Sequence, residues 1–256
     1  MKTFQLYVIL CFISLNSFCQ TPIANSSNSS IALFNGKNLD GWYQVIEKNG
    51  IEQRLFKAEN GVIHAYATQT ENTLQPFGAI ITEKEYENYT LTLEYKWGEK
   101  KFRPRENAVR DAGIIFHEHG EDVIWPAGIE CQIQEGDTGD LWIVKSRASS
   151  TIDPMHKNFN KDGLLGTFGT LESQYNRLPR SFCWEKAGWN KVVLVVKGDF
   201  AQFYINDQLV NEAIAMKKWD ENQKKWIPLT KGKILLQAEG SEVFYRNITL
   251  QPLVKE

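Results

Sequence analysis

The segment Gly128–Glu135 alternates in a way that could place chemically useful side chains on one surface. Read as a strand, it presents Glu130, Gln132 and Gln134 on one face and three apolar residues on the other. Amides both donate and accept hydrogen bonds, which suits sugar hydroxyls, and a carboxyl group can transfer a proton. A solvated sheet face is the alternative, but such faces usually mix Thr, Lys and Glu rather than repeat Gln. We therefore predict that this strand forms the polar floor of a sugar-binding cleft.

A second carboxylate, Glu135, ends the same segment. Two carboxylates could serve as the acid and the nucleophile of a retaining glycosidase, which lie about 5–5.5 Å apart. A spacing of five residues puts Glu130 and Glu135 on opposite faces of a strand unless a β-bulge intervenes. Both are candidate catalytic residues, although the spacing alone does not single them out.

Two histidines lie at the end of the run Arg110–His119. If this run is a strand, His117 shares a face with Gly113 and Ile115. Imidazole titrates near neutral pH, so His117 could act as an acid, a base or a metal ligand. We predict a catalytic role for His117, whereas His119 is equally well explained as a strand-end residue in a loop.

Further polar side chains are candidates for contact with a substrate. Glu94 lies on the polar face of the predicted strand Tyr89–Trp97, where a solvated carboxylate is an equally good explanation. The other candidates are Arg110 and Lys145 as cations, Trp142 as a stacking surface, and Asp111. The sequence contains no nucleophile elbow, phosphate loop or dinucleotide fingerprint, which argues against esterase, kinase and dehydrogenase chemistry.

The elements that must position these residues are predicted to be strands, because apolar and polar residues alternate with a period of two. The predicted strands are Tyr89–Trp97, Ala112–His119, Ile129–Gln134, Lys191–Lys197, Ala201–Ile205, Gln208–Val210, Gly232–Glu239 and Val243–Leu250. Only Asn211–Lys218 has weak helical character. Short strands joined by Gly, Asn and Asp turns predict an all-β sandwich or jelly roll. Between Gly136 and Trp184 the pattern breaks, which predicts a long insertion that lies over the cleft if it is ordered.

The N-terminal 19 residues are predicted to be a signal peptide. Lys2 precedes the apolar run Phe4–Leu15, which is too short to span a bilayer, and Ser17 and Cys19 fit a cleavage site. Acylation of Cys19 is the less favoured alternative, because a bulky Phe18 precedes it. We expect an exported protein, periplasmic or extracellular, with a flexible tether over 20–30 and one domain over 31–256. No second apolar stretch is long enough for a transmembrane helix.

Charge and cysteine content narrow the range of partners. The formal charge of −2 shows no basic excess, which argues against a nucleic-acid partner. Cys131 and Cys183 are the two cysteines outside the predicted signal, and they could be buried thiols or a disulfide. A metal site built on these two alone is not expected, because no His/Cys spacing accompanies them.

Six short motifs, in this order, resemble one protein family. They are Leu33–Trp42, Asp111–Phe116, Gly128–Ile133, Trp189–Asn190, Gly232–Gln237 and Tyr245–Ile248. The set is similar to the family once called DUF1080, the 3-keto-disaccharide hydrolase or 3-keto-glucoside 1,2-lyase/3-keto-2-hydroxy-glucal hydratase domain. The resemblance spans about Ile31 to Leu253. The family's Gly-Tyr-Glu motif reads Gly-Ile-Glu here, so Glu130 is kept.

This resemblance implies a concanavalin A-like jelly-roll β-sandwich of two curved antiparallel sheets, with the site on the concave face. It also implies a carbohydrate substrate already oxidised at C3, so that a base can remove the acidified C2 proton and the aglycone can leave C1 by elimination. Of Glu130 and His117, one would be the base and the other the acid. Arg110, Lys145 or a divalent metal ion would hold the enolate charge. An upstream sugar 3-oxidoreductase is the expected pathway partner. The alternative functions are a conventional retaining glycoside hydrolase that uses Glu130 and Glu135, and a non-catalytic carbohydrate-binding module.

Overall fold

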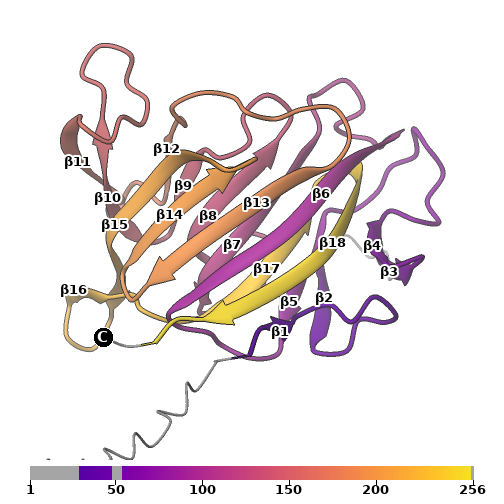
Figure 1. Ribbon diagram of the computed structural model, residues 1–256, viewed down its shortest axis with the longest axis horizontal. Coiled ribbons are helices and arrows are strands. Elements are labelled where there is room, and N and C mark those ends of the chain that lie inside the picture. Colours follow the sequence, from indigo (N-terminus) through magenta and orange to yellow (C-terminus); the bar gives the residue numbers. More distant parts are fainter. Residues whose placement is uncertain (1–28, 48–53, 255–256) are drawn as a thin grey trace, which may run out of the picture.

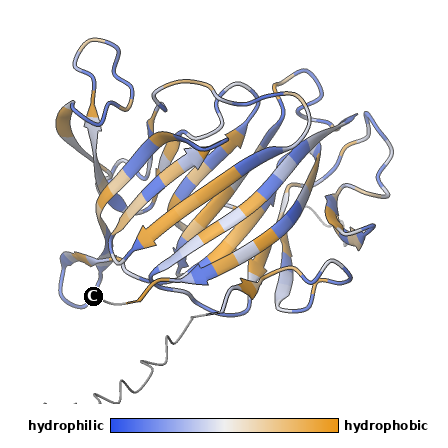
Figure 2. Cartoon of the chain, viewed as in Figure 1, coloured by the Kyte–Doolittle hydropathy of each residue, from blue (hydrophilic) through white to orange (hydrophobic). Residues whose placement is uncertain are grey.

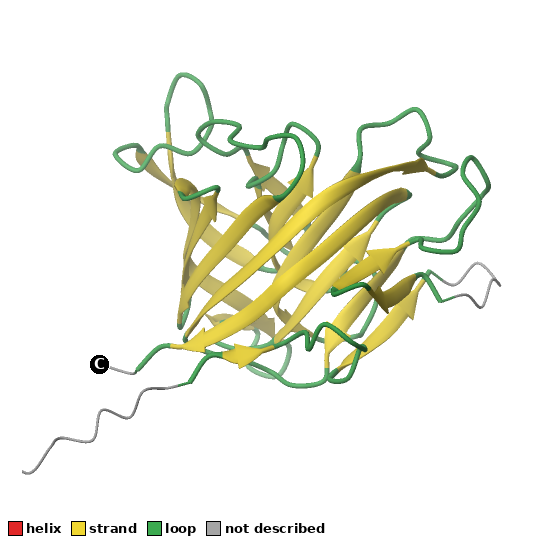
Figure 3. Ribbon diagram, turned by 45° about the vertical axis from the view of Figure 1, so that its right-hand side comes forward, coloured by secondary structure: helices red, strands yellow, loops and turns green. Residues whose placement is uncertain are grey.

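The computed structural model describes residues 29–47 and 54–254. Every element of regular secondary structure within these ranges is a β-strand. The strands form two antiparallel sheets packed face to face (Figures 1 and 3). This arrangement confirms the predicted jelly-roll sandwich. No helix in the described ranges could cross a membrane. The predicted signal peptide and residues 20–28 of the predicted tether lie outside the described residues.

The larger sheet has eleven strands and lies in front in Figure 1. Across the sheet the order is β11 (Leu164–Phe168), β10 (Arg147–Ile152), β15 (Gln208–Asp220), β14 (Phe200–Ile205), β13 (Asn190–Lys197), β6 (Tyr89–Lys101), β18 (Ser241–Pro252), β4 (Val62–Ala65) and β3 (Phe56–Glu59), with β1 (Ile31–Ala32) paired to β18 and β16 (Lys225–Pro228) paired to β15.

The smaller sheet has seven strands and carries most of the sequence-predicted site residues. Its order is β12 (Tyr175–Leu178), β9 (Leu141–Val144), β8 (Ala127–Gln134), β7 (Asp111–His119), β17 (Lys233–Ala238), β5 (Gly78–Thr82) and β2 (Trp42–Ile46).

The core lies between the sheets and follows from the alternation in the sequence (Figure 2). Leu91, Leu93 and Tyr95 of β6 are buried, while the residues between them are partly exposed. Ile129 and Ile133 of β8 pack into the same core from the opposite sheet. Each such large apolar side chain contributes about 1.5–3 kcal/mol on burial. The same alternation turns Glu130, Gln132 and Gln134 away from the core, onto the outer face of the smaller sheet.

Two expectations about secondary structure are wrong. Residues 211–218 are not helical but continue β15, paired with β14 and β10. Residues 136–184 do not form a long loop inserted between strands. They contain β9 to β12, which extend both sheets.

The two cysteines outside the predicted signal do not form a disulfide. Cys131 is buried, Cys183 is exposed, and both are free thiols.

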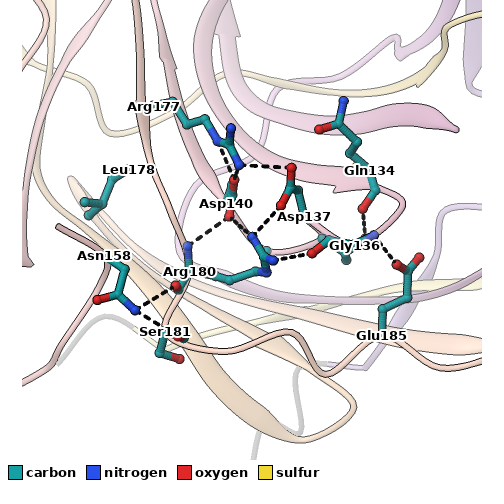
Figure 4. A network of polar contacts seen from close by, with 12 residues as sticks. Gln134, Gly136, Asp137, Asp140, Asn158, Arg177, Leu178, Arg180, Ser181 and Glu185 are labelled. Atoms are coloured by element: carbon teal, nitrogen blue, oxygen red, sulfur yellow. Dashed lines mark hydrogen bonds and ion pairs between the residues drawn. The ribbon is translucent and has the colours of Figure 1, made fainter. Parts of the chain in front are cut away.

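A group of ion pairs, here called the turn cluster, fixes the β8–β9 turn (Figure 4). It consists of Asp137, Asp140, Arg177 and Arg180. The Asp140 side chain is fully buried; its Oδ1 lies 2.8 Å from Arg180 and its Oδ2 2.5 Å from Arg177. Asp137 pairs with the same two guanidinium groups at 3.0 and 2.8 Å. Because β9 and β12 flank this turn, the cluster also positions the side chains at that edge of the smaller sheet.

Candidate active site

An open cleft of about 590 Å³ lies on the outer face of the smaller sheet. Its lining comes from β7, β8, β9, β12 and the loops around them: Arg105, Asp111, Trp125, Glu130, Gln132, Gln134, Trp142, Val144, Tyr175 and Glu239. Five sequence-predicted residues meet here, namely Asp111, Glu130, Gln132, Gln134 and Trp142. The polar face of β8 is therefore part of a cavity wall.

Three buried carboxyl groups and a guanidinium form the centre of this cleft, and we name them the cleft cluster: Asp111, Glu130, Glu239 and Arg105. Arg105 Nη2 lies 2.6 Å from Asp111 Oδ2, and its Nη1 lies 3.6 Å from Glu239 Oε2. Glu239 directly follows β17 and accepts a 2.8 Å hydrogen bond from Trp125 Nε1. Two of the three carboxyl groups thus share the charge of Arg105, and Glu130 has no ion pair with it.

Glu130 lies where the neighbouring strand has no side chain. A Cβ atom at Gly113 of β7 would overlap both Glu130 Oε1 and Gln237 Oε1, so these two oxygens share the space above the glycine. Gln237 Oε1 is buried and has no hydrogen-bond partner among the described residues. Burial, followed by the charges of Glu239 and Asp111, raises the pKa of Glu130 well above its ordinary value. In its protonated form Glu130 carries an O–H donor in the same space as this unpartnered oxygen.

Asp111 and Glu239, unlike Glu130, lie next to Arg105 and accept hydrogen bonds from side-chain N–H groups, and these contacts stabilise their ionised forms. Burial raises the pKa of Asp111, against the lowering effect of Arg105 and of the Gln134 amide. Burial and the charge of Asp111 raise the pKa of Glu239 to about 7, while the Trp125 N–H and Arg105 act in the opposite direction. The cleft cluster therefore combines Glu130, whose environment favours the protonated form, with Glu239, whose pKa of about 7 lets it exchange a proton near neutral pH.

Amide and aromatic side chains complete the cleft. Gln132 and Gln134 donate hydrogen bonds of 3.1 and 2.9 Å from their Nε2 atoms to the two oxygens of Asp111. Gln132 Oε1 is left buried without a partner among the described residues. Trp125, Trp142 and Tyr175 form the aromatic part of the lining. Amide oxygens beside aromatic rings suit a ligand with hydroxyl groups and apolar C–H faces.

The structure does not bring His117 to this cleft, contrary to the expectation that it shares a face with Gly113. The β7–β8 register shifts after Phe116, and His117 has a φ of 51°, so a bulge reverses the alternation. The imidazole is buried against Tyr89 and Phe116, and its Nε2 lies 3.0 Å from the carbonyl oxygen of Gly198 on the other sheet. Burial lowers the pKa of His117 to about 4, so the ring is neutral at pH 7.

Glu135 and Arg110 pair with each other at the end of β8. Glu135 Oε1 lies 2.8 Å from Arg110 Nη1, and its Oε2 accepts a hydrogen bond from the Arg110 backbone N–H. Neither side chain belongs to the cleft lining, whereas Glu130 does. Glu130 and Glu135 therefore do not line the same cleft, as their spacing of five residues predicts for a strand without a bulge between them.

Glu94 and Lys145 also lie apart from the cleft cluster. Glu94 is on β6 of the larger sheet, where it pairs with Arg246 at 2.6 Å and accepts a hydrogen bond from Asn247. This position corrects its assignment to the substrate site. Lys145 follows β9 and lines an adjacent hollow, with its Nζ 3.5 Å from the Trp125 carbonyl oxygen.

A divalent metal was one of the cations considered for this site. Within the described residues, no three His, Cys, Asp or Glu side chains are grouped to hold a metal ion. The guanidinium of Arg105 instead lies against Asp111 and near Glu239. The donor set of the described residues therefore does not fit a metal centre.

Sequence reasoning missed Glu239, Arg105 and Trp125. Glu239 lies on the same face of the predicted strand Gly232–Glu239 as Lys233, Leu235 and Gln237, so a strand-neighbour argument could have found it. Arg105 and Trp125 lie on loops, where no periodicity indicates which way a side chain points.

Two curved antiparallel sheets identify the fold as a concanavalin-like sandwich. The polar cleft with aromatic walls is typical of proteins of this fold that act on or bind carbohydrates. The chain belongs to the 3-keto-alpha-glucoside-1,2-lyase-like domain family, whose model matches residues 29–251. Two solved structures of candidate glycosyl hydrolases from Parabacteroides distasonis ATCC 8503 share the fold, both with a TM-score of 0.53. They are 19% and 20% identical over 88% of this chain, and over 94% and 100% of their own. Comparison with curated protein sequences finds no match.

Proposed function

We propose that this protein cleaves 3-keto-glycosides by elimination and then hydrates the product, so that the net reaction is hydrolysis. The observation that carries the proposal is the cleft cluster, in which three buried carboxyl groups and one guanidinium line the same cavity. Membership of the 3-keto-alpha-glucoside-1,2-lyase-like family ties the chain to carbohydrate chemistry and supports this choice of substrate.

In the elimination, Glu239 is the base and Glu130 the acid. The Trp125 N–H and Arg105 favour the ionised form of Glu239, which removes the C2 proton made acidic by the C3 ketone. The electron pair passes into an enolate, next to the positive charge of Arg105. As the enolate reforms the ketone, a double bond forms between C1 and C2 and the C1–O bond breaks. Glu130 gives its proton to the departing oxygen.

Hydration reverses these proton movements. Water adds to C1 of the 3-keto-2-hydroxy-glucal while Glu130, now ionised, accepts a water proton. The proton held by Glu239 exchanges with water in the open cleft, and Glu239 then delivers a solvent-derived proton to C2, which leaves both carboxyl groups in their starting states. No covalent sugar–enzyme bond is required. The aromatic side chains and the amides of Gln132 and Gln134 would hold the ring.

Product analysis in deuterium oxide tests this reaction. A 3-keto-disaccharide should release its aglycone and give a 3-keto-sugar with deuterium at C2, measured at early times by mass spectrometry. Incubation of the free 3-keto-sugar under the same conditions corrects for spontaneous exchange at C2. Cleavage without C2 deuterium above this background would indicate direct hydrolysis and contradict the proposal. Saturable binding without any product would leave a carbohydrate-binding module.

A pair of matched variants locates the chemistry. Glu130→Gln keeps the size of the side chain but removes the transferable proton, and we expect cleavage of the 3-keto-disaccharide to fall about 10²–10⁴-fold. Glu94→Gln makes the same change on the larger sheet and should leave the rate unchanged. Retained activity in Glu130→Gln would remove this residue from catalysis.

A further inference from the structure

Glu130 and Gln237 meet across a strand that lies between them. Ile115 of β7 pairs with Glu130 of β8 on one side and with Leu235 of β17 on the other. Residues two strands apart in a sheet are about 9–10 Å apart, and the side chain of the middle strand normally separates theirs. Gly113 has no side chain. Glu130 Oε1 and Gln237 Oε1 each lie 2.0 Å from the place that a Cβ atom would take there, so the two oxygens are within about 4.0 Å of each other.

A contact on the other side of the Gln237 amide fixes which way the amide faces. Its Nε2 donates a 3.4 Å hydrogen bond to the carbonyl oxygen of Ile124, in the β7–β8 connection. A carbonyl oxygen only accepts hydrogen bonds, so the reverse orientation of the amide would place two acceptors against each other. Gln237 Oε1 therefore points to Glu130. This oxygen is buried and has no hydrogen-bond partner among the described residues, so it lacks a donor.

The protonation state of Glu130 decides whether this oxygen is satisfied. An ionised carboxylate has no donor and would place oxygen against oxygen in a desolvated space. A protonated carboxyl group has an O–H to donate. Burial, followed by the charges of Glu239 and Asp111, raises the pKa of Glu130 and so favours the same form.

Ionisable groups from several elements surround Glu130. They are Asp111 of β7, Cys131 of β8, Tyr245 of β18, Glu239 after β17 and Arg105 before β7. Burial raises the pKa of Cys131 and of Tyr245 well above their ordinary values, so both are neutral at pH 7. The ion pairs of Arg105 go to Asp111 and Glu239. Gln237 Oε1 receives no hydrogen bond from any of these groups, which leaves the Glu130 carboxyl group as its available donor.

We propose that Gln237 is a positioning residue that keeps the acid of the cleft protonated and ready to donate. Its amide oxygen accepts a hydrogen bond from the Glu130 O–H. The same carboxyl group lines the cleft, where rotation of the O–H directs the proton to a ligand oxygen. Once the proton has left, the carboxylate faces the amide oxygen, and their repulsion favours the return of a proton from water during hydration. The inference rests on the proposed function, because it deepens the role of Glu130 as the acid, while Gln237 itself lies outside the cleft lining.

Carbon-13 NMR of the glutamate carboxyl carbons measures the protonation of Glu130 directly, and the Glu130→Gln variant identifies its resonance. Gln237→Met keeps the length of the side chain but removes the acceptor. Because a hydrogen bond to the protonated form is lost, we expect the titration midpoint of Glu130 to fall by about 0.5–1 pH unit. An unchanged or higher midpoint would overturn the proposal.

Two more variants separate this contact from a general effect of substitution. Gly113→Ala leaves Gln237 intact but places a methyl group between the two oxygens, so the midpoint of Glu130 should fall here as well. If Gln237→Met does not fold, Gly113→Ala decides by the same criterion. Gln202→Met makes the matching exchange on β14 of the larger sheet, where Gln202 bonds Glu212, and should leave the midpoint unchanged. A fall in Gln202→Met as large as in Gln237→Met would reject the specific contact.

The reaction gives a second readout. Cleavage of a 3-keto-disaccharide should slow at high pH as Glu130 loses its proton, and in Gln237→Met this decline should move to lower pH by the same amount as the NMR midpoint. A decline that stays in place while the midpoint moves would reject the role of Gln237 in the reaction. If the wild type does not cleave the substrate, the proposed elimination is wrong, and the NMR titration still decides whether Gln237 holds the proton on Glu130.

Discussion

The turn cluster lies at the turn that follows β8, and the cleft cluster includes Glu130 of β8 itself. The two clusters surround their buried carboxyl groups with different charges. In the turn cluster, two aspartates face two arginines, so the buried charges cancel. In the cleft cluster, three carboxyl groups and one guanidinium line the cavity, and the guanidinium pairs with only two of them, Asp111 and Glu239. The first arrangement holds a turn in place, whereas the second leaves excess negative charge in a desolvated cavity.

This difference separates a structural role from a chemical one. A balanced buried pair is costly to break, because removal of one partner leaves an uncompensated charge. In the cleft cluster the carboxyl groups outnumber the guanidinium. Burial and the repulsion between carboxylates therefore favour the protonated forms and raise the pKa values of Glu130 and Glu239. Protons that are held near neutral pH beside a cavity are available for transfer to a ligand.

The largest expected effect distinguishes the roles within the cleft cluster. In Glu130→Gln, a 3-keto-glucoside with a nitrophenol leaving group should be cleaved within about 10-fold of the wild-type rate, because nitrophenolate departs without a proton. A sugar alkoxide does not, so the same variant should lose about 10²–10⁴-fold on a 3-keto-disaccharide. Glu239→Gln should lose comparable activity on both substrates, since C2 deprotonation precedes either departure. Steady-state rates for the four combinations check the assignment, and the reverse pattern would exchange the two roles.

The turn cluster should show a large effect on stability instead. Asp140→Asn leaves Arg177 and Arg180 without their fully buried partner, and we expect a loss of about 3 kcal/mol in the free energy of unfolding. Urea denaturation measures this value. Asp137→Asn, whose side chain is about one-third exposed, should cost less. Glu130→Gln should not lower the free energy of unfolding at pH 7. A loss as large as that of Asp140→Asn would contradict the different roles assigned to the two clusters.

The sandwich could be predicted from the sequence because its central strands alternate strongly. The predicted strands Tyr89–Trp97 and Ile129–Gln134 are parts of β6 and β8 in the structure. Residues 211–218 misled the prediction, because Ala, Glu, Met and Lys are good helix formers while pairing with β14 and β10 decides the outcome. A bulge at Ala215, with a φ of 50°, further obscures the alternation.

The candidate site was only partly predictable. Glu130, Gln132 and Gln134 follow from the period of one strand, which sequence reveals directly. His117 was misplaced because a bulge cannot be read from the residue types around it. Arg105 and Trp125 reach the cleft from loops, and Glu239 arrives through strand pairing of β17 with β7. These positions depend on contacts between segments that are far apart in the chain.

The pH dependence of stability tests the excess charge of the cleft cluster. The folded-state pKa of Glu239 is about 7, above its ordinary value of 4.5, so the protein favours the protonated form. Its stabilising contribution is present below pH 4.5 and is lost as the pH rises through 7, by about 1–3 kcal/mol. Burial also raises the pKa of Glu118 to about 7, so this residue adds to the same loss of stability with rising pH. Urea denaturation from pH 4.5 to 8 should therefore show a smaller decline in Glu239→Gln than in the wild type, and equal declines would contradict the raised pKa.

The smallest effect is expected at the remaining carboxylate of the β8 segment, Glu135. Its partner Arg110 and its own side chain are both partly exposed, so their ion pair should contribute less than about 1 kcal/mol to the free energy of unfolding. Glu135→Gln should also cleave a 3-keto-disaccharide within about twofold of the wild-type rate, because this carboxylate lies outside the cleft lining. A retaining glycosidase that used Glu130 and Glu135 would lose nearly all activity in this variant and would cleave unoxidised glucosides. Both assays on the same preparation therefore decide whether Glu130 acts with the other residues of the cleft cluster or with Glu135.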